Sequence, residues 1–407
     1  MPVVDEDVVM YDVDALRTLV PALSDGTAYF DAPGGTQTPA PVAGVVARTM
    51  TSGISNRGTV TASERRAEEV VRGARNAMAD LLGADPRGVV FGRSMTQITY
   101  DLARTLAAGW SEGDEVVVSR LDHDANVRPW VQAAERAGVT VRWIDFDPQT
   151  AELTVDDVAA VLTERTRLVA LTAASNLVGT RPDVAAISRL VHDAGALFAV
   201  DGVHATAHAG TDVGALGADF HLCSPYKFMG PHCGVLAASP ELLETLHPDK
   251  LAPSTDAVPE RFELGTLPYE LLAGTSATVD LIASLGSGDS GTTRRERVLD
   301  AMAAIEEHED RLRLRIENGL VDLGAQLWSR AARRTPTLLF RLPGVADADV
   351  HRGLAERGVN APAGSFYALE CSRRLGLGDT GAVRVGLAPY SDAGDVDRLL
   401  TALGELV

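Results

Sequence analysis

The chain has 407 residues, of which 45% are hydrophobic and 23% charged, as in a soluble globular protein with a large core. This length favours two domains that share an interface. The formal charge of −19 argues against binding to nucleic acid or to anionic membranes, because both require clustered Lys and Arg.

The three cysteines, Cys223, Cys233 and Cys371, include no C-x-x-C pair. Such a set suits a reducing compartment and argues against a disulfide framework or a structural zinc, so we expect no metal site. The acidic N-terminus lacks the cationic region of a signal peptide, and no apolar run approaches the length of a membrane span. We therefore expect a soluble, cytoplasmic protein.

The first 30 residues are predicted to form an N-terminal arm with a short helix at 13–20 and a strand at 28–30. The loop DAPGGTQTP, residues 31–39, follows this arm. Its two glycines, Gly34 and Gly35, stand between prolines and allow the backbone to approach a ligand closely. A plain turn explains the same pattern equally well.

Strands and helices then alternate along the chain. This alternation indicates βαβ units and a mostly parallel sheet, hence an α/β fold. The predicted strands lie at 88–92, 115–119, 139–144, 168–173, 197–200, 218–223 and 234–238. The predicted helices lie at 62–82, 95–108, 126–137, 155–162 and 184–194.

A change in pattern beyond residue 251 predicts a second domain. A loop with three prolines precedes an apolar helix at 270–285, and the segment GSGDSG, residues 286–291, is typical of a flexible break. We therefore predict an arm at 1–30 that packs with the small domain, a large domain at 31–288 and a small domain at 289–407. The small domain should contain helices at 294–323, 347–357 and 393–406, and strands at 336–342 and 382–387.

Five predicted strands end in polar residues: Ser94, His123, Asn176, Asp201 and Lys227. Ser94 can cap a helix whose first N–H groups bind an anion, His123 can stack on a flat aromatic ligand, and Asn176 can bond a phenolate oxygen. Taken singly, each of these also fits a helix cap or a loop. Together they fall at one edge of one sheet, which is where open α/β sheets bind ligands.

Asp201 and Lys227 are separated by 227 − 201 = 26 residues, and each follows a buried strand. A buried acid with a lysine nearby is what a pyridinium cofactor held through a Schiff base requires. The pair therefore predicts such a cofactor.

The motifs around these residues carry a family resemblance. VDGVH followed by SPYKFMGPHCGVL, together with HDANVRPW, SNLVGT, RFELGT and RVGLAPYSDAGDVDRL, resembles the fold-type-I pyridoxal-phosphate enzymes of aminotransferase class V. The nearest likeness is to the branch of cysteine desulfurases, selenocysteine lyases and isopenicillin N epimerase-like proteins. It runs from about Asp31 to the C-terminus. The resemblance implies a large domain with a mostly parallel seven-stranded sheet, a smaller α+β C-terminal domain, and an amino-acid substrate.

The resemblance also implies a role for each matching residue. Lys227 would hold pyridoxal 5'-phosphate and move the Cα proton, for which its pKa must be lowered. Asp201 would pair with the pyridinium nitrogen, His123 would stack on the ring, and Asn176 would bond the 3-oxygen. The substrate would be bound by Gly34, Gly35 and Arg384, with Arg384 clamping the α-carboxylate. The phosphate would be held by Ser94, Met95, Thr96, His204 and Ser224, and by Gly265 and Thr266 of the other subunit of a homodimer.

One loop departs from the family pattern. Desulfurases carry a nucleophilic cysteine there, whereas this chain has Tyr367, and Cys371 follows on the next predicted helix, where we expect a packing role. We therefore predict a C–S lyase that works by β-elimination. The alternatives are an epimerase or racemase, with Tyr367 as a second acid, and a class V aminotransferase; Tyr367 can equally be an aromatic wall of the pocket. A non-catalytic protein that binds the cofactor is disfavoured, because it has no use for Arg384.

Overall fold

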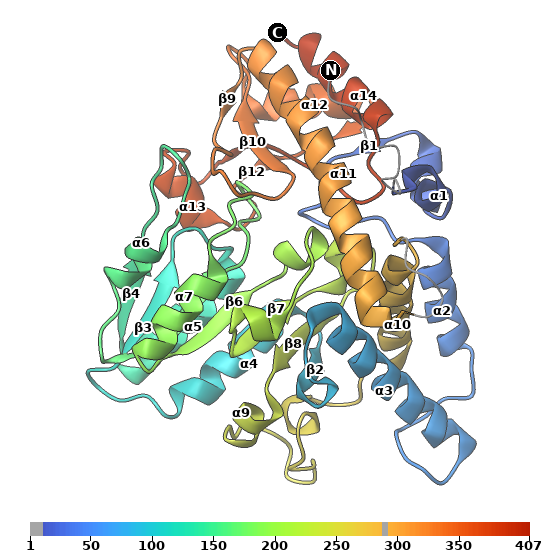
Figure 1. The fold of residues 1–407 in the computed structure, drawn as a ribbon, viewed down its shortest axis with the longest axis vertical. Coiled ribbons are helices and arrows are strands. Elements are labelled where there is room, and N and C mark those ends of the chain that lie inside the picture. The colour runs from blue at the N-terminus through green and yellow to red at the C-terminus, as the bar shows by residue number, and fades with distance from the viewer. Residues whose placement is uncertain (1–10, 287–291) are drawn as a thin grey trace.

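The computed structural model describes residues 11–286 and 292–407, which contain a large seven-stranded sheet, a small four-stranded sheet and one further pair of short strands (Figure 1). Most of the predicted break at 286–291 lies outside the described residues, so the boundary at 288 stays a prediction. Helix α11 (Arg294–Asp322) follows this gap and runs past both sheets (Figure 1). Its first half packs Val298, Met302 and Ile305 into the core of the large domain, and its second half packs Ile316 and Leu320 against the small sheet.

The large sheet has seven strands in the order β2-β8-β7-β6-β5-β3-β4. Only β8 is antiparallel to its neighbours, β7 and β2, whereas the other pairs are parallel. The predicted mostly parallel seven-stranded sheet is therefore confirmed. The strands are β2 (Val89–Gly92), β3 (Glu115–Ser119), β4 (Thr140–Ile144), β5 (Thr166–Thr172), β6 (Leu197–Asp201), β7 (Phe220–Cys223) and β8 (Gly234–Ala238).

Helices cover both faces of this sheet, which explains why its strands are apolar runs rather than alternating ones. Val116 and Val118 pack on the side of α4 (Met95–Ala107) and α5 (Arg128–Ala137), whereas Val117 packs on the opposite side. That opposite side is covered by α3 (Ala62–Leu82), α6 (Val155–Ala159), α7 (Val184–Asp193) and α10 (Tyr269–Ala283), together with part of α11. The large domain also contains α2 (Ala40–Met50), α8 (Val213–Leu216) and α9 (Pro240–Glu244).

The small domain is an antiparallel sheet in the order β12-β13-β10-β9, packed against helices. Its apolar core joins this sheet to α11 and to two later helices. The strands are β9 (Gln326–Leu327), β10 (Thr337–Arg341), β12 (Ala363–Gly364) and β13 (Ala382–Gly386). The helices that follow α11 are α12 (Asp347–Glu356), α13 (Leu369–Arg374) and α14 (Ala393–Gly404).

The segment before the large domain packs against the small one. After α1 (Val13–Thr18), strand β1 (Ala28–Tyr29) pairs in parallel with β11 (Val359–Asn360). Tyr11 donates a hydrogen bond to the carbonyl of Pro389, at 2.9 Å, and Arg17 binds Asp395 at 2.7 Å. These contacts place residues 31–35, which follow β1, beside β13 of the small sheet.

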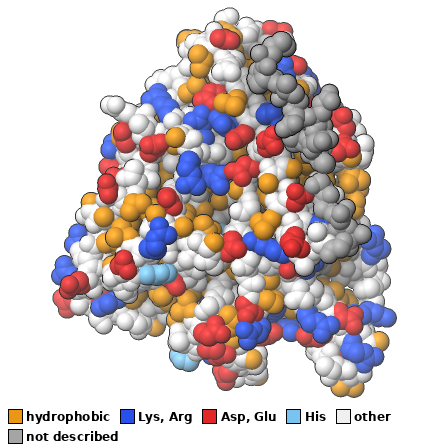
Figure 2. Space-filling view, in the orientation of Figure 1, with side chains coloured by type: hydrophobic (Ala, Val, Ile, Leu, Met, Phe, Trp, Pro, Cys, Tyr) orange, Lys and Arg blue, Asp and Glu red, His pale blue; other side chains and the backbone are white. Residues whose placement is uncertain are grey.

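The face shown in Figure 2 has acids and arginines interspersed rather than gathered by sign. Many of the arginines are paired with acids, as in Arg294 with Asp80 at 2.7 Å. Within residues 11–286 and 292–407, no helix is both long and apolar enough to cross a membrane.

Candidate active site

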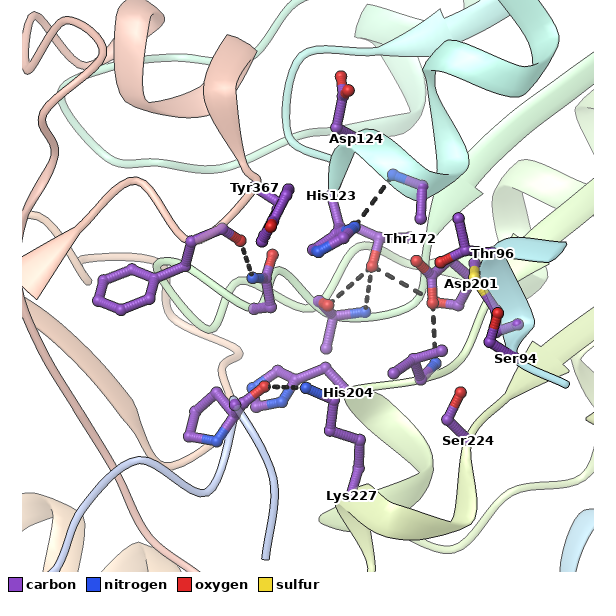
Figure 3. Close-up of a pocket in the computed structure, with 18 of the residues that line it drawn as sticks. Ser94, Thr96, His123, Asp124, Thr172, Asp201, His204, Ser224, Lys227 and Tyr367 are labelled. Carbon is purple, nitrogen blue, oxygen red and sulfur yellow. Dashed lines mark hydrogen bonds between the residues drawn. The ribbon is translucent and has the colours of Figure 1, made fainter. Parts of the chain in front are cut away.

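A cavity of about 680 Å³ opens at the carboxyl edge of the large sheet, next to the small domain. The five residues predicted at strand ends all line it, and Figure 3 shows four of them, Ser94, His123, Asp201 and Lys227, around one space. Its lining also includes these predicted residues: Gly34, Met95, Thr96, His204, Ser224, Tyr367 and Arg384. Gly35 and Gly265 do not line the cavity, and Thr266 lines a second one beside Arg93.

Lys227 ends a short turn after β7, and its ammonium nitrogen donates a hydrogen bond to the carbonyl of Pro33. The nitrogen also lies 4.8 Å from the centre of the Tyr226 ring. Burial, and then the nearby charge of Arg384, lower the pKa of Lys227 to about 8. At neutral pH the ammonium therefore still predominates, but the uncharged amine, the form that reacts as a nucleophile, is much more populated than for an ordinary lysine.

Asp201 is the last residue of β6, and its carboxyl group is buried. One oxygen, Oδ1, accepts a hydrogen bond from the backbone N–H of Val203 at 2.9 Å. Burial raises the pKa of Asp201 to about 6, although the N–H of Val203 and the charge of Lys227 oppose the rise. A cation placed against this carboxylate would relieve that cost, because an unpaired buried charge is expensive.

His123 points into the same cavity and is neutral. Its Nδ1 accepts a hydrogen bond from the N–H of Ala125 at 3.0 Å, and burial followed by the charge of Lys227 lowers its pKa to about 4. The Tyr367 ring lies 5.5 Å away, centre to centre. A neutral imidazole can stack on an aromatic ligand without opposing a positive charge on it.

The N-terminus of α4 reaches the cavity and leaves its first N–H groups open. Ser94 caps the helix by accepting the N–H of Gln97 at 3.1 Å, so the N–H groups of Met95 and Thr96 have no partner within the helix. The hydroxyl-bearing residues Ser94, Thr96 and Ser224 also line the cavity here. Free N–H groups and hydroxyls at a helix N-terminus are suited to binding a phosphate.

Two of the side chains predicted to bind the cofactor, Asn176 and His204, already form hydrogen bonds with the small domain. Asn176 Nδ2 donates to the carbonyl of Phe366 at 3.0 Å, which leaves one of its two hydrogens for a ligand. His204 Nε2 lies 2.9 Å from Thr335 Oγ1 and 3.0 Å from Thr337 Oγ1. His204 thus directs this nitrogen toward the small domain, and the phosphate role that the motif implies stays a prediction.

Tyr367 and the residue before it form a strained turn at the cavity mouth. Phe366 and Tyr367 have φ of +51° and +58°, values that are costly for side chains with a Cβ. The turn is held by the N–H of Asp124, which donates to the carbonyl of Tyr367 at 2.7 Å. The Tyr367 side chain itself is 76% exposed.

The three cysteines share a buried setting that raises the pKa of their thiols. All are unpaired and buried, and Cys371 lies within α13. Burial raises the pKa of Cys371 and Cys223 and brings that of Cys233 to about 11. Thiols in this state are protonated and poor nucleophiles.

The sequence prediction missed two acids at the candidate site, Asp31 and Asp122. It also missed that the scarcity of lysine in the chain points to Lys227. Asp31 pairs with Arg384 at 2.6 Å, and the buried Asp122 interacts with Asp201 electrostatically. The chain has only two lysines. The other one, Lys250, lies 3.2 Å from Asp256 in a surface loop and does not line the cavity.

Comparisons with known proteins agree along most of the chain. A family model described as Aminotransferase class-V matches residues 28–399. The chain is 35% identical over 401 residues to an uncharacterized protein, MT3887, of Mycobacterium tuberculosis, covering 97% of this chain and 99% of that one. It is 31% identical over 396 residues to a probable cysteine desulfurase of Pseudomonas aeruginosa, covering 93% and 94%. The crystal structure of the cysteine desulfurase CsdA from Escherichia coli matches with a TM-score of 0.85 and 28% identity, covering 98% of this chain and 100% of that one.

Proposed function

The chain belongs to the aminotransferase class-V family and to its cysteine desulfurase-like branch, and from this we propose a pyridoxal-phosphate enzyme that cleaves a C–S bond of an amino acid by β-elimination. The observation that carries the proposal is the meeting of Lys227, Asp201 and His123 with the N-terminus of α4 in one cavity. If each of these residues had only a structural role, nothing would require an amine, a buried acid, a neutral imidazole and free helix N–H groups to meet in one cavity.

The residues present fit this cofactor. Asp201 would face its ring nitrogen, because the buried carboxylate has an oxygen without a backbone partner and needs a cation. His123 would cover its ring, and Asn176 would donate its remaining N–H to the 3-oxygen. The phosphate would be held by Ser94, Met95, Thr96 and Ser224.

Pyridoxal phosphate, when bound, supplies an aldehyde that links to an amine and a ring that draws electrons away from the substrate Cα. Lys227 would bond to the cofactor before substrate arrives and then accept the Cα proton at Nζ, for which a pKa of about 8 is suited. Asp201 would keep the ring nitrogen protonated. Arg384 would orient the substrate through its α-carboxylate.

The cavity lining favours elimination over sulfur transfer to the protein. Transfer requires an accessible thiolate, and each cysteine is buried and protonated. A β-elimination requires no such group: the Cβ–S bond breaks, the sulfur leaves as thiolate, and the three-carbon remainder of a cysteine-type substrate takes up one water to give pyruvate and ammonia.

A second candidate reaction is epimerisation, which one contact favours. Tyr367 lies beside His123 at the cavity mouth, where its hydroxyl would deliver a proton to Cα from the side opposite Lys227. An aminotransferase is the third candidate, and it would need a keto acid as acceptor.

We also propose a homodimer with shared sites, located in the cytoplasm. Gly265 and Thr266 are exposed and lie away from the cavity of their own chain, which is consistent with their reaching the partner's phosphate. The adjacent Leu264 is 56% exposed, as an interface residue would be in a single chain. The free cysteines support a reducing compartment.

The test begins with the cofactor. Purified wild type should be yellow and lose its visible absorption band in Lys227→Ala, whereas Lys250→Ala should keep it. A colourless wild type that also fails to bind added cofactor would contradict the proposal.

The reaction is then assigned by its products. Incubation with cysteine, cystine and S-conjugates should release sulfide or a thiol with pyruvate. Alanine with a protein-bound persulfide would instead indicate a true desulfurase, and exchange of the Cα hydrogen without net product would indicate an epimerase. Product that forms only when a keto acid is added would indicate a transaminase.

A further inference from the structure

The predicted carboxylate clamp, Arg384, already has two protein partners for its terminal NH groups, whereas its buried Nε has none among the described residues. Its NH2 group binds Asp31 Oδ1 at 2.6 Å, and its NH1 group donates to the carbonyl of Asn176 at 3.0 Å. One face of the guanidinium lies 3.7 Å from the centre of the Phe366 ring. The side chain is only 2% exposed, so a ligand entering the cavity meets its partners first.

Asp31 is the partner that stands on the cavity side. Its side chain is 32% exposed against the 2% of Arg384, and both residues line the cavity. Asp31 therefore presents its carboxylate to Arg384 in the way that a substrate carboxylate would, as an oxygen bound to the guanidinium NH2.

The loop that carries Asp31 is shaped for this pairing. Asp31 forms a β-bridge with Gly386, two residues beyond Arg384 on β13, and its carbonyl accepts the N–H of Gly34 at 2.8 Å. A Cβ on Gly34 would lie 2.5 Å from Asp31 Oδ2, so a larger residue at this position would push the carboxylate out of its present place beside Arg384. The backbone is thus fixed, and only the side chain of Asp31 is free to turn away from Arg384.

We propose that Asp31 is an internal competitor for the substrate's carboxylate, holding Arg384 until a substrate carboxylate displaces it. This inference rests on the proposed function, since it takes Arg384 as the carboxylate seat. The exchange replaces one anion by another, so the buried guanidinium keeps a counter-charge throughout. Asp31, already partly exposed, turns into the cavity.

Asp31 consequently acts as a specificity residue. A ligand without a carboxylate cannot replace Asp31 as the anionic partner of Arg384. It therefore leaves the ion pair intact and forms no contact with Arg384. A carboxylate ligand gains the clamp but must first release Asp31 from it. Removal of the Asp31 charge should therefore tighten the binding of carboxylates and leave the binding of their amides unchanged.

The test measures the affinity of the cofactor-loaded enzyme for propionate, which has a carboxylate but no amine to react. Titrations of wild type, Asp31→Asn, Asp31→Ala and Arg384→Ala would follow the visible band and the melting temperature, with sodium chloride as the ionic control and propionamide as the uncharged control. Asp31→Asn and Asp31→Ala should each bind propionate ~10-fold more tightly, a change that corresponds to about 1.4 kcal/mol. Arg384→Ala should lose propionate binding, and propionamide should not distinguish wild type from the Asp31 variants.

The sign of the change separates this role from a structural one. If Asp31 only held Arg384 in place, its removal would weaken propionate binding, and that result would overturn the proposal. Equal affinities in wild type and both Asp31 variants, with binding lost in Arg384→Ala, would also overturn it while leaving the carboxylate seat intact. Propionate binding that survives in Arg384→Ala would show that Arg384 does not bind the carboxylate, and would overturn this part of the proposed function.

Discussion

At the scale of single residues, Asp122 is a second buried acid that interacts with Asp201, and its surroundings determine its protonation state. Its carboxylate accepts hydrogen bonds from Ser119 and from Asn126 Nδ2, the latter at 2.7 Å. Burial raises the pKa of Asp122 to about 8, although the hydrogen bonds from Ser119 and Asn126 oppose the rise. Asp122 is therefore largely protonated at neutral pH, which leaves Asp201 as the charged member of the two.

This predicts a pH dependence for the cofactor-free protein. The folded pKa of Asp122 lies above the unfolded value of 3.8, so the folded state binds more protons and the free energy of unfolding falls as pH rises from about 4 to about 8. Asp122→Asn should show a less negative slope in urea unfolding across that range. His123 and His204, whose pKa values are lowered, contribute the opposite slope below their ordinary pKa in both proteins and cancel in the comparison.

The control for that measurement is Asp256→Asn, because Asp256 is 88% exposed and should leave the slope unchanged. An equal slope in wild type and Asp122→Asn would show that Asp122 is ionised in the folded protein.

The same residues mark how much of the site could be predicted from sequence. The placement of Asp201 and Lys227 at the candidate site could be, because Asp201 ends an apolar run that forms a buried strand, and Lys227 ends the short turn after another. The role of Asp31 could not, because it depends on Arg384, which lies 353 residues away and adjoins it only through the pairing of β1 with the small domain. Asp122 stood beside His123 in the sequence, but only the fold shows that it is buried near Asp201.

At the scale of elements, the close packing of β8 against α4 fixes where the proposed phosphate site lies. Gly234 opens β8, and a Cβ there would overlap the backbone of Ser94 and Met95. The N-terminus of α4 can approach the sheet this closely only because Gly234 has no side chain.

Gly234→Ala should therefore displace the start of α4. We expect a loss of ~1–3 kcal/mol in the free energy of unfolding, typical of overpacking, together with weaker binding of pyridoxal phosphate in a titration. Gly109→Ala is the matched control, since the nearest atom to an added Cβ, the carbonyl oxygen of Leu106, is 3.6 Å away. Destabilisation of Gly234→Ala with unchanged cofactor affinity would separate α4 from the phosphate site.

The elements themselves were predicted with uneven success. The bounds of α3 and β3 were predicted to the residue, because a long amphipathic period and a β-branched run are strong local signals. Helix α2 was missed because prolines stand at Pro39 and Pro41, a pattern that also suits the start of a helix. A helix was expected around Cys371, but the bounds of α13 were not predicted, because its six residues are too few to show a period.

At the scale of the whole molecule, the proposed sharing of sites predicts complementation between subunits. Lys227→Ala lacks the amine, whereas Thr266→Glu would place a negative charge against the partner's phosphate. In mixed dimers the Lys227 of a Thr266→Glu chain would be completed by the Thr266 of a Lys227→Ala chain, giving one intact site in each mixed dimer.

Borohydride reduction followed by mass spectrometry would measure this. Cofactor fixed to Lys227 of the Thr266→Glu chain should be scarce in that variant alone and increase after it is mixed with Lys227→Ala. No increase after verified subunit exchange would place Thr266 outside the partner's site.

The scarcity of lysine in this molecule has a further consequence for chemical labelling. Lys227 lines the cavity and Lys250 does not, and amine-directed reagents meet only these two lysine side chains in the whole chain. A protease specific for lysine would cut the unfolded chain into residues 1–227, 228–250 and 251–407, and a blocked Lys227 would fuse the first two. A ligand that shields Lys227 during labelling would leave this lysine cleavable. The fragment pattern would therefore report whether the cavity is occupied, even when the substrate is unknown.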